Sequence, residues 1–376
     1  MSKQEYQANT DPSLGEKLIA IARAHIKPNP RSTGDGDYAY VEMVGDVDCP
    51  LLDAEGLCVW MKHAGRHVCS TCTSFPCTTM LYQGEEYLMP SGGCEAVLES
   101  LLARTEPVRM VSRDNDETPR NYYVHITPEL VKQRPLLGHY PALVDFGLAM
   151  LQDRTRPLDQ RVARLLEVLA RIDHLETTDR LAELPTFLEE FLAQPGTASP
   201  QPDAAVPWLP VFVCGEVFSH YCHSSAHVPT AVRILEGLGV AVQTVQDENG
   251  TPHSVPQLRS REVYPTKRTS FDGFFASRAV FFEHVAVSLY LKMLLPVREP
   301  SVWAHATYFA AMYAAVKGAV VGYFAPEIPT DQQLVDVLVE AIRMGTHSEL
   351  MYPTICTRLK AARLDSLQAM QALVQS

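Results

Sequence analysis

The sequence predicts a mainly α-helical protein, in which a helical bundle-like body follows a loop-rich, metal-organised cysteine module near the N-terminus. Apolar residues recur three and four positions apart through most of the chain after Tyr140, which is the period of an amphipathic helix. By contrast, the segment from Cys49 to Cys77 has little periodicity and holds five of the nine cysteines. A doubly wound α/β sheet is disfavoured, because strands and helices do not alternate regularly.

Composition narrows the class of protein. With 376 residues, 46% of them hydrophobic, the chain is long enough for one large domain or two ordinary ones. A net charge of −12 argues against a nucleic-acid partner, because phosphates attract a basic surface. The N-terminus lacks the layout of a signal peptide, and the longest apolar runs, from Val280 and from Tyr308, contain charged residues that make them marginal as membrane spans. We therefore expect a cytoplasmic protein with neither a nucleic acid nor a membrane as its partner.

The N-terminal elements follow from local signals. Residues 11–27 carry apolar side chains at helical spacing behind the caps Asp11 and Ser13, which predicts a helix. Residues 28–37 are rich in Pro, Gly and Asp, so they break this helix and form a loop. Residues 38–44 predict a short strand that leads to the first cysteine.

Two domains are expected. The first, residues 1–110, combines the N-terminal helix with the cysteine-rich metal-cluster module, and the second, residues 111–376, is helical. Residues 195–207 are rich in Pro and Ala and have the composition of a linker or a long surface loop. The expected helices after the cysteine segment cover residues 94–108, 142–152, 158–175, 178–194, 227–239, 271–295, 301–324, 330–345 and 354–374.

The cysteine segment predicts a metal site. Tight spacing, an odd total and the missing export signal favour thiolate metal chemistry in a reducing compartment over a disulfide scaffold. Cys69 and Cys72 form a CxxC pair, which lets both thiolates reach one zinc ion or two irons of a cluster. The alternative is that these cysteines are buried small hydrophobes or free thiols. Four ligands suffice for either metal, and six candidates are present: Cys49, Cys58, Cys69, Cys72, Cys77 and Cys94.

A second group of cysteines and histidines lies in the stretch CGEVFSHYCHSSAH, which contains Cys214, His220, Cys222, His223 and His227. These residue types can bind zinc, but their spacing fits no zinc-finger pattern and their surroundings are apolar. We interpret this stretch as the wall of a packed region and not as a metal site.

The cysteine pattern resembles that of the flagellin lysine N-methylase (FliB) family, within a wider group of cysteine-rich iron- or zinc-chelating proteins. The runs CPLLDAEGLCVW, TCTSFP and GGCEAVLESLL carry the resemblance, in which Cys49, Cys58, Cys72 and Cys94 match the four cysteine positions of the family. The N-terminal cysteine motif of the family, which ends in a double Cys, is missing here, since residues 1–48 contain no cysteine.

The resemblance extends, more weakly, from about Tyr38 to Met351. RTRPLDQRVARLLEVLARI is similar to a family helix that starts with a short polar residue, Leu, two variable residues and Arg. FFEHVAVSLYLKMLLP resembles the family's Glu-Asn-hydrophobic segment, and IRMGTHSELM resembles its C-terminal Arg and Glu-His region. Cys69 and Cys77 are additional to the family pattern. Either they replace ligands lost from the N-terminus, or the cluster has been remodelled along with the substrate.

The resemblance implies an iron–sulfur enzyme that transfers a methyl group from S-adenosylmethionine to lysine side chains of flagellin in the cytoplasm. The implied cofactors are a [4Fe–4S] cluster, with zinc as the alternative, and S-adenosylmethionine. Neither a glycine-rich strand-to-helix turn nor a CxxxCxxC motif is present in the sequence, so the binding of S-adenosylmethionine is expected on the resemblance alone. Two alternatives remain: an enzyme of the same fold acting on a small-molecule amine, and a non-catalytic zinc or iron–sulfur binding protein.

Methyl transfer to lysine by simple displacement needs a neutral amine, whereas a free lysine titrates near pH 10.4. An active site would therefore desolvate the lysine or place a carboxylate or a tyrosine beside it. Five residues on predicted helices near the family-like motifs are candidates for this role: Glu283, His284, Tyr290, His347 and Glu349.

Overall fold

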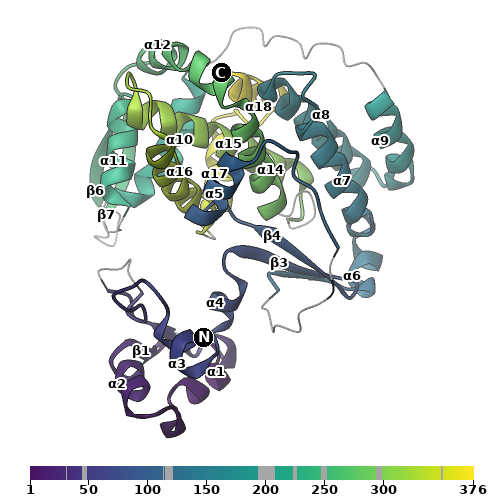
Figure 1. The fold of residues 1–376 in the computed structure, drawn as a ribbon. Coiled ribbons are helices and arrows are strands. Elements are labelled where there is room, and N and C mark those ends of the chain that lie inside the picture. Colours follow the sequence, from purple (N-terminus) through teal and green to yellow (C-terminus); the bar gives the residue numbers. More distant parts are fainter. Residues whose placement is uncertain are drawn as a thin grey trace. The chain divides into compact units, whose positions relative to one another are not determined.

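The computed structural model describes residues 1–30, 32–44, 49–112, 114, 122–193, 208–222, 227–246, 252–293, 299–348 and 350–376. Over these residues the chain is mainly α-helical (Figure 1), which confirms the predicted α-helical body, whereas the metal-organised cysteine module stays a prediction. The fold divides into two compact units: unit 1 is Met1–Met80 with Ser112–Tyr123, and unit 2 is Leu81–Val111 with Val124–Ser376. Within the described part of the chain, no helix is both long enough and apolar enough to cross a bilayer. The expected linker at 195–207 lies outside the described residues.

Unit 1 consists of short elements. Its first helix, α1, opens with a capping box, in which the Ser2 side chain accepts a hydrogen bond from the Glu5 backbone and the Glu5 side chain accepts one from the Ser2 backbone. The predicted helix at 11–27 begins later than expected, because Pro12–Leu14 forms a 3₁₀ turn before it. The elements are α1 (Lys3–Asn9), α2 (Glu16–His25), β1 (Ile26–Pro28), β2 (Ala39–Val41), α3 (Val59–Ala64) and α4 (Ser70–Ser74), with β1 and β2 antiparallel.

The core of unit 1 is small and has a polar centre. Trp60 is fully buried and donates from its indole Nε1 to Asn9 Oδ1 at 3.0 Å. The amide of Asn9 in turn donates to the Val68 carbonyl at 2.6 Å, and Arg66 donates to Asn9 Oδ1 at 2.8 Å. Through these bonds Asn9 ties the end of α1 to α3 and to the chain just before Cys69, so the cysteine segment is attached to the core at a fixed point.

The strands are few and short. β3 (Cys77–Tyr82) begins in unit 1 and ends in unit 2, and it lies between β4 (Glu85–Pro90) and β5 (Val124–Ile126). A hairpin of β6 (Val240–Gln246) and β7 (Pro252–Leu258) is antiparallel, with Val240 opposite Leu258. This hairpin was not predicted.

The body of unit 2 is a set of helices around one buried central helix, α15 (Val302–Phe324), which contacts α8, α10, α11, α16 and α18. At its crossing with α11 the backbones touch: a Cβ on Gly237 would lie 1.7 Å from the Gly322 carbonyl oxygen. The other helices are α5 (Glu95–Ala103), α6 (Pro128–Gln133), α7 (Tyr140–Leu151), α8 (Leu158–Thr177), α9 (Leu184–Ala193), α10 (Leu209–Phe218), α11 (Val228–Gly237), α12 (Val263–Ser270), α13 (Asp272–Ser277), α14 (Ala279–Lys292), α16 (Asp331–Thr346), α17 (Met351–Ala361) and α18 (Leu367–Gln375).

Candidate functional site

The CxxC pair of unit 1 stands at the start of a helix. Cys69 is the N-cap of α4 and Cys72 lies within it, so one helical turn brings both thiols to the same side. Their sulfur atoms are 3.6 Å apart. The two thiols share one proton: the hydrogen bond with Cys72 lowers the pKa of Cys69 to about 6, and the same bond raises the pKa of Cys72. This pair is therefore prepared to carry negative charge, the form in which thiols bind metals.

Two more thiols join this pair. Cys49 and Cys58 flank a loop that closes on itself through a hydrogen bond from the Val59 nitrogen to the Leu51 carbonyl, at 2.8 Å. Burial raises the pKa of Cys49, and negative charge on Cys58 and Cys69 raises it further, which places these thiols within electrostatic reach of one another. Cys49 is thus electrostatically linked to the three other thiols, and thiolate sulfur is the donor that zinc and iron–sulfur clusters select.

The four thiols of Cys49, Cys58, Cys69 and Cys72 do not form a coordination shell for a metal. Among the described residues, no three His, Cys, Asp or Glu side chains form a group that could hold a metal ion as they stand. Cys77, at the first position of β3, is half-buried in unit 1. Cys94 is the N-cap of α5 and belongs to unit 2. Within unit 1 the structure brings Cys69 and Cys72 into contact and places Cys49 within electrostatic reach of Cys58, Cys69 and Cys72.

The other group of cysteines and histidines has ordinary packing partners. Cys214 is buried with its sulfur against Gly318, and Cys222 donates to the Phe218 carbonyl at 3.6 Å. His227 lies 3.5 Å from a carboxylate oxygen of Glu340. His223 lies outside the described residues. These contacts favour the interpretation of this stretch as packed structure.

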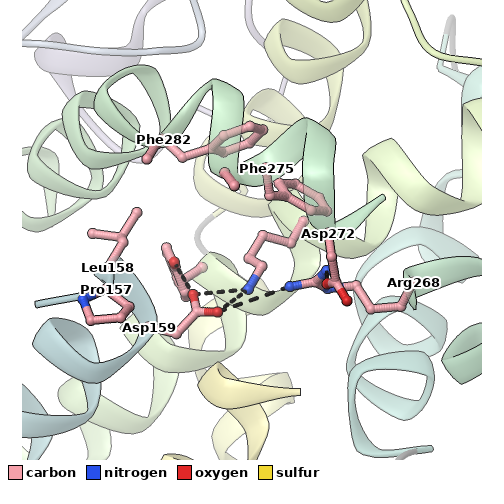
Figure 2. A pocket seen from close by; sticks show the side chains of 11 residues that line it. Pro157, Leu158, Asp159, Arg268, Asp272, Phe275 and Phe282 are labelled. Carbon is pink, nitrogen blue, oxygen red and sulfur yellow. Dashed lines mark hydrogen bonds and ion pairs between the residues drawn. The ribbon is translucent and has the colours of Figure 1, made fainter. Parts of the chain in front are cut away.

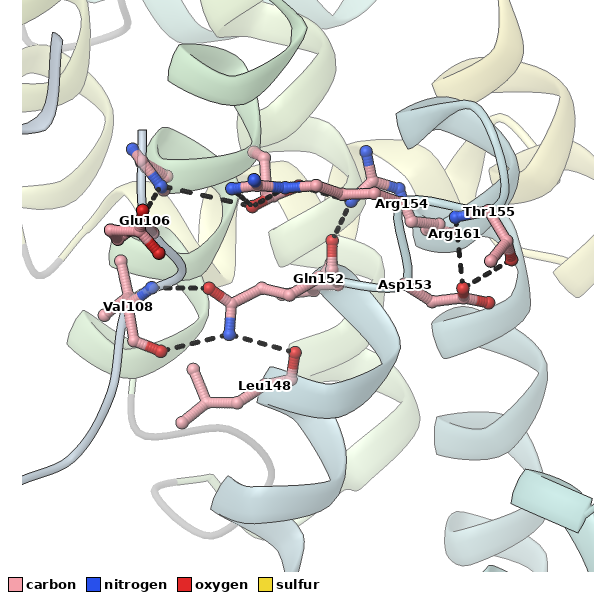
Figure 3. A network of polar contacts seen from close by, with 11 residues as sticks. Glu106, Val108, Leu148, Gln152, Asp153, Arg154, Thr155 and Arg161 are labelled. Atoms are coloured by element: carbon pink, nitrogen blue, oxygen red, sulfur yellow. Dashed lines mark hydrogen bonds and ion pairs between the residues drawn. The ribbon is translucent and has the colours of Figure 1, made fainter. Parts of the chain in front are cut away.

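Glu283 is engaged on both carboxylate oxygens. It is fully buried in α14, with Arg154 Nη2 2.9 Å from one oxygen and Arg161 Nη1 2.6 Å from the other. Figure 3 shows the side chains of Arg154 and Arg161 in this network of polar contacts. Burial alone would raise the pKa of Glu283, but the hydrogen bonds from the two guanidinium groups outweigh it and lower this pKa. Glu283 is thus an anchored carboxylate that joins α14 to α8 and to the end of α7.

Each of the remaining predicted catalytic residues has its own packing partners, and His284 Nε2 also lies 4.0 Å from a carboxylate oxygen of Glu283. His284 is buried, and its ring nitrogens are each 3.1 Å from a backbone carbonyl, of Leu101 and Glu106. Tyr290 donates to the Leu143 carbonyl at 2.7 Å, and its ring fills the space left by a glycine of α7.

His347 follows α16 and packs on Gly93, where an added Cβ would lie 2.9 Å from its Nε2. Partial burial, together with the charges of Lys292 and Arg343, lowers the pKa of His347 to about 4. It is therefore neutral at physiological pH. Glu349 lies outside the described residues. The structure does not gather the described members of this set around one cavity, and their catalytic roles stay predictions.

A pocket of about 330 Å³ lies where four helices of unit 2 meet the start of α8 (Figure 2). One part of its wall is apolar and comes from the start of α8 and from α13 and α14. The other part carries charges, and all of its members stand on helices. The lining residues are Pro157, Leu158, Asp159, Arg268, Asp272, Phe275, Ala276, Ala279, Phe282, Tyr313 and Lys317.

A buried lysine, an aspartate and a tyrosine form the polar end of this pocket. Lys317 of α15 is only 4% exposed, and its Nζ lies 2.9 and 2.8 Å from the two carboxylate oxygens of Asp159. Tyr313, one turn earlier on α15, donates to Asp159 Oδ1 at 2.5 Å. Asp159 stands in the first turn of α8, where the helix dipole favours a carboxylate.

Two further groups complete the charge pattern. Arg268 pairs with Asp272, and its guanidinium lies 4.6 Å from the ring centre of Phe275. Its Nη2 is 4.0 Å from Asp159 Oδ2, and its buried Nε has no hydrogen-bond acceptor among the described protein atoms. Two cations therefore face two carboxylates, and the four groups together carry no formal net charge.

Burial controls the titration of the lysine. Loss of solvent lowers the pKa of Lys317, the charge of Arg268 lowers it further, and Asp159 only partly compensates. Burial and the charge of Asp159 raise the pKa of Tyr313 well above its usual value, so Tyr313 stays a neutral donor. The arrangement offers a desolvated amine that is easier to deprotonate than an ordinary lysine.

The Glu283 network supports this pocket. Arg161, which Glu283 binds, stands two residues after Asp159 on α8, and Glu283 itself follows Phe282 of the pocket wall. The ion pair therefore fixes the positions of two walls. Sequence reasoning missed Asp159, Tyr313 and Lys317 as site residues. The available signal was a single lysine inside the apolar run YFAAMYAAVKGAVV.

A comparison with known protein families identifies the family of this chain. Residues 144–373, more than half of the chain, match the model of the FliB lysine N-methylase C-terminal domain. The chain belongs to the FliB family. The matched region of this FliB-family protein contains the whole pocket and the Glu283 network. The cysteines of unit 1 lie before the matched region in the sequence. The resemblance seen in the sequence is thereby confirmed. No curated protein and no solved structure significantly matches the chain.

Proposed function

We propose that the protein transfers methyl groups to lysine side-chain amines of a protein substrate. The observation that carries this proposal is the match to the FliB lysine N-methylase C-terminal domain over residues 144–373, a region that encloses the pocket of Asp159 and Lys317. A cavity with apolar walls and a few convergent polar groups is the usual form of a binding site.

The finer parts of the proposal come from the resemblance. The methyl donor is S-adenosylmethionine, the substrate is flagellin and the compartment is the cytoplasm, where thiols stay reduced. Unit 1 would hold a [4Fe–4S] cluster, or zinc in its place, through Cys49, Cys58, Cys69 and Cys72, whose sulfur donors suit either group. If only three of these thiolates bound the cluster, its fourth iron would stay open and would supply a site for the methionyl group of the donor.

A second candidate function is methylation of a small-molecule amine. The volume of the pocket, about 330 Å³, favours it, since this space suits a small molecule as well as it suits a side chain. A non-catalytic metal-binding protein is the third alternative, and it predicts that no methyl transfer occurs at all.

The test is an anaerobic purification with iron, sulfide and zinc analysis, followed by incubation with flagellin and methyl-labelled S-adenosylmethionine. We expect about four irons with matching sulfide and label on flagellin lysines. Changing Cys49, Cys58, Cys69 or Cys72 to Ser should remove the metal, whereas Cys222→Ser is the matched control, because a serine hydroxyl can keep the bond to the Phe218 carbonyl. Metal-loaded protein that labels neither flagellin nor small amines contradicts the proposal.

A further inference from the structure

We propose that the pocket at the start of α8 binds the acceptor amine as its ammonium ion, and that Lys317 takes the proton that this ammonium must lose. The identity of the reaction rests on the proposed function. Amine binding does not, because it follows from the shape and the charges of the pocket.

The walls suit an alkyl chain that ends in a positive charge. Leu158, Phe282 and Ala279 offer apolar surface for methylene groups. The rings of Phe275 and Phe282 lie 4.9 Å apart, and an aromatic face attracts a cation. The site therefore matches the two parts of a lysine side chain, an apolar stem and a charged tip.

Two carboxylates can accept hydrogen bonds from the ammonium group of the acceptor amine. The side chain of Asp159 is 27% exposed even though it contacts Tyr313 and Lys317, and that of Asp272 is 63% exposed. A carboxylate offers about four acceptor positions. The contacts of Lys317 and Tyr313 leave Asp159 Oδ2 with acceptor capacity, because Arg268 is 4.0 Å from this oxygen and makes no hydrogen bond to it.

Lys317 can remove a proton from an acceptor ammonium that binds beside it. Two ammonium groups beside one carboxylate repel each other, so one of the two amines is driven toward its neutral form. Burial already favours the neutral form of Lys317, which can then accept a proton from the acceptor ammonium. The same principle, a lysine beside another cationic group, activates amine nucleophiles in other enzymes.

The step balances as a displacement. The acceptor ammonium gives one proton to the Lys317 amine and becomes neutral. Its lone pair then forms the new N–CH₃ bond, while the C–S bond of a methylsulfonium donor breaks and leaves its electron pair on sulfur as a neutral thioether. The positive charge moves from sulfur to the methylated nitrogen. Lys317 returns its proton to solvent through Asp159, which reaches the mouth of the pocket.

An anionic ligand fits less well. Lys317 and Arg268 are each already paired with a carboxylate, and a bound anion would face Asp159 and Asp272 directly. The comparison of ligand charges is therefore a direct test.

The first arm measures binding to the purified full chain by calorimetry, with n-butylammonium, n-butanol and butyrate as probes. We expect n-butylammonium to bind at least about tenfold more tightly than either other probe, since hydrogen bonds to charged groups are worth more than neutral ones. Asp159→Asn should remove this preference. Tighter binding of butyrate, or no preference, would overturn the inference whether or not the protein is a methyltransferase.

The second arm measures initial rates of methyl transfer. Lys317→Arg keeps the positive charge and the pairing with Asp159 but cannot take up a proton, so we expect at least about a 100-fold lower rate near neutral pH. Lys317→Met, which keeps the length of the side chain, should behave alike, and Lys360→Arg on the exposed face of α17 is the control. Folding of each variant is checked by circular dichroism.

The pH profile separates proton transfer from a structural role. The titratable groups that face Lys317 are Asp159, Arg268, Asp272 and Tyr313. As the pH rises toward about 10.4, the acceptor loses its proton without help, so the gap between wild type and Lys317→Arg should close. A gap that stays constant with pH would overturn the inference. Absence of methylation by the wild type would instead refute the proposed function. The calorimetric comparison of the three probes would then decide whether the pocket binds an ammonium ion.

Discussion

The thiols of unit 1 and the pocket of unit 2 hold their functional groups in different ways. Cys69 and Cys72 stand on α4, a helix of five residues, and Cys72 is exposed. Lys317 and Asp159 stand on helices of 23 and 20 residues, and Lys317 is only 4% exposed. The pocket is thus organised by packing and ion pairs before any ligand arrives, whereas the proposed metal site of unit 1 would gain its order from the metal itself.

The largest effect should follow from removing the metal ligands. Changing both Cys69 and Cys72 to Ser removes the exposed pair, and structural metal sites contribute about 10 kcal/mol or more to folding. We expect the double variant to lose its metal and the hydrogen-exchange protection of α1 to α4, while α15 keeps its protection. Full protection of α1 to α4 without metal would show that the small core around Trp60 is sufficient.

Breaking the buried ion pair should be the next largest effect. Glu283→Gln leaves Arg161 with an uncompensated charge beside a neutral amide, which typically costs about 3–5 kcal/mol. We expect a lower denaturation midpoint for unit 2 and slower methyl transfer. The reason is that the ion pair between α8, which carries Asp159, and α14, which carries Phe282, is lost. Glu183→Gln, which breaks the exposed pair with Arg180, should leave the midpoint unchanged. Equal midpoints for the two variants would contradict the account.

A backbone contact gives a smaller effect. Gly237→Ala places a methyl group against the Gly322 carbonyl and must separate α11 from α15, which we expect to cost about 1–3 kcal/mol. Gly273→Ala is the matched control, since open space surrounds the position of its added Cβ. Thermal unfolding of both variants tests the prediction, and equal stability would mean that the crossing can relax without loss.

The pH dependence of stability should show the smallest change. Because the folded state lowers the pKa of Glu283, its contribution is present above the unfolded value of about 4.3 and is lost as the pH falls through the folded value. We expect the wild type to lose stability below about pH 4 more steeply than Glu283→Gln. Denaturant titrations at several acidic pH values measure the two slopes, and parallel slopes would show that Glu283 does not contribute.

Long periodic helices were predictable from the sequence. The expected helices at 158–175 and 301–324 correspond to α8 (Leu158–Thr177) and α15 (Val302–Phe324). The hairpin of β6 and β7 was missed, because most of β6 is not buried and because β7 contains Pro252 and Pro256, which are unusual in a strand. Tertiary pairing, which period and composition do not reveal, stabilises these strands.

The two candidate sites also differ in how much of them the sequence could predict. Cys69 and Cys72 are three positions apart, so their approach was visible in the spacing alone. Asp159 and Lys317 are 158 positions apart, and each has an ordinary appearance in its own helix. Only the packing of α8 against α15 makes them neighbours. Glu283 was selected as a candidate, but the partners that anchor it, Arg154 and Arg161, depend on the same packing.

One measurement tests the central claim most directly: the metal content and the methyl-transfer rate of Lys317→Arg, determined on one anaerobic preparation beside the wild type. The account predicts a metal content equal to that of the wild type and a rate at least about 100-fold lower near neutral pH. That result would show that metal binding does not depend on Lys317 and would support the assignment of the proton transfer to the pocket. A wild-type rate in a variant with normal metal content would contradict the assignment of the acceptor site to this pocket.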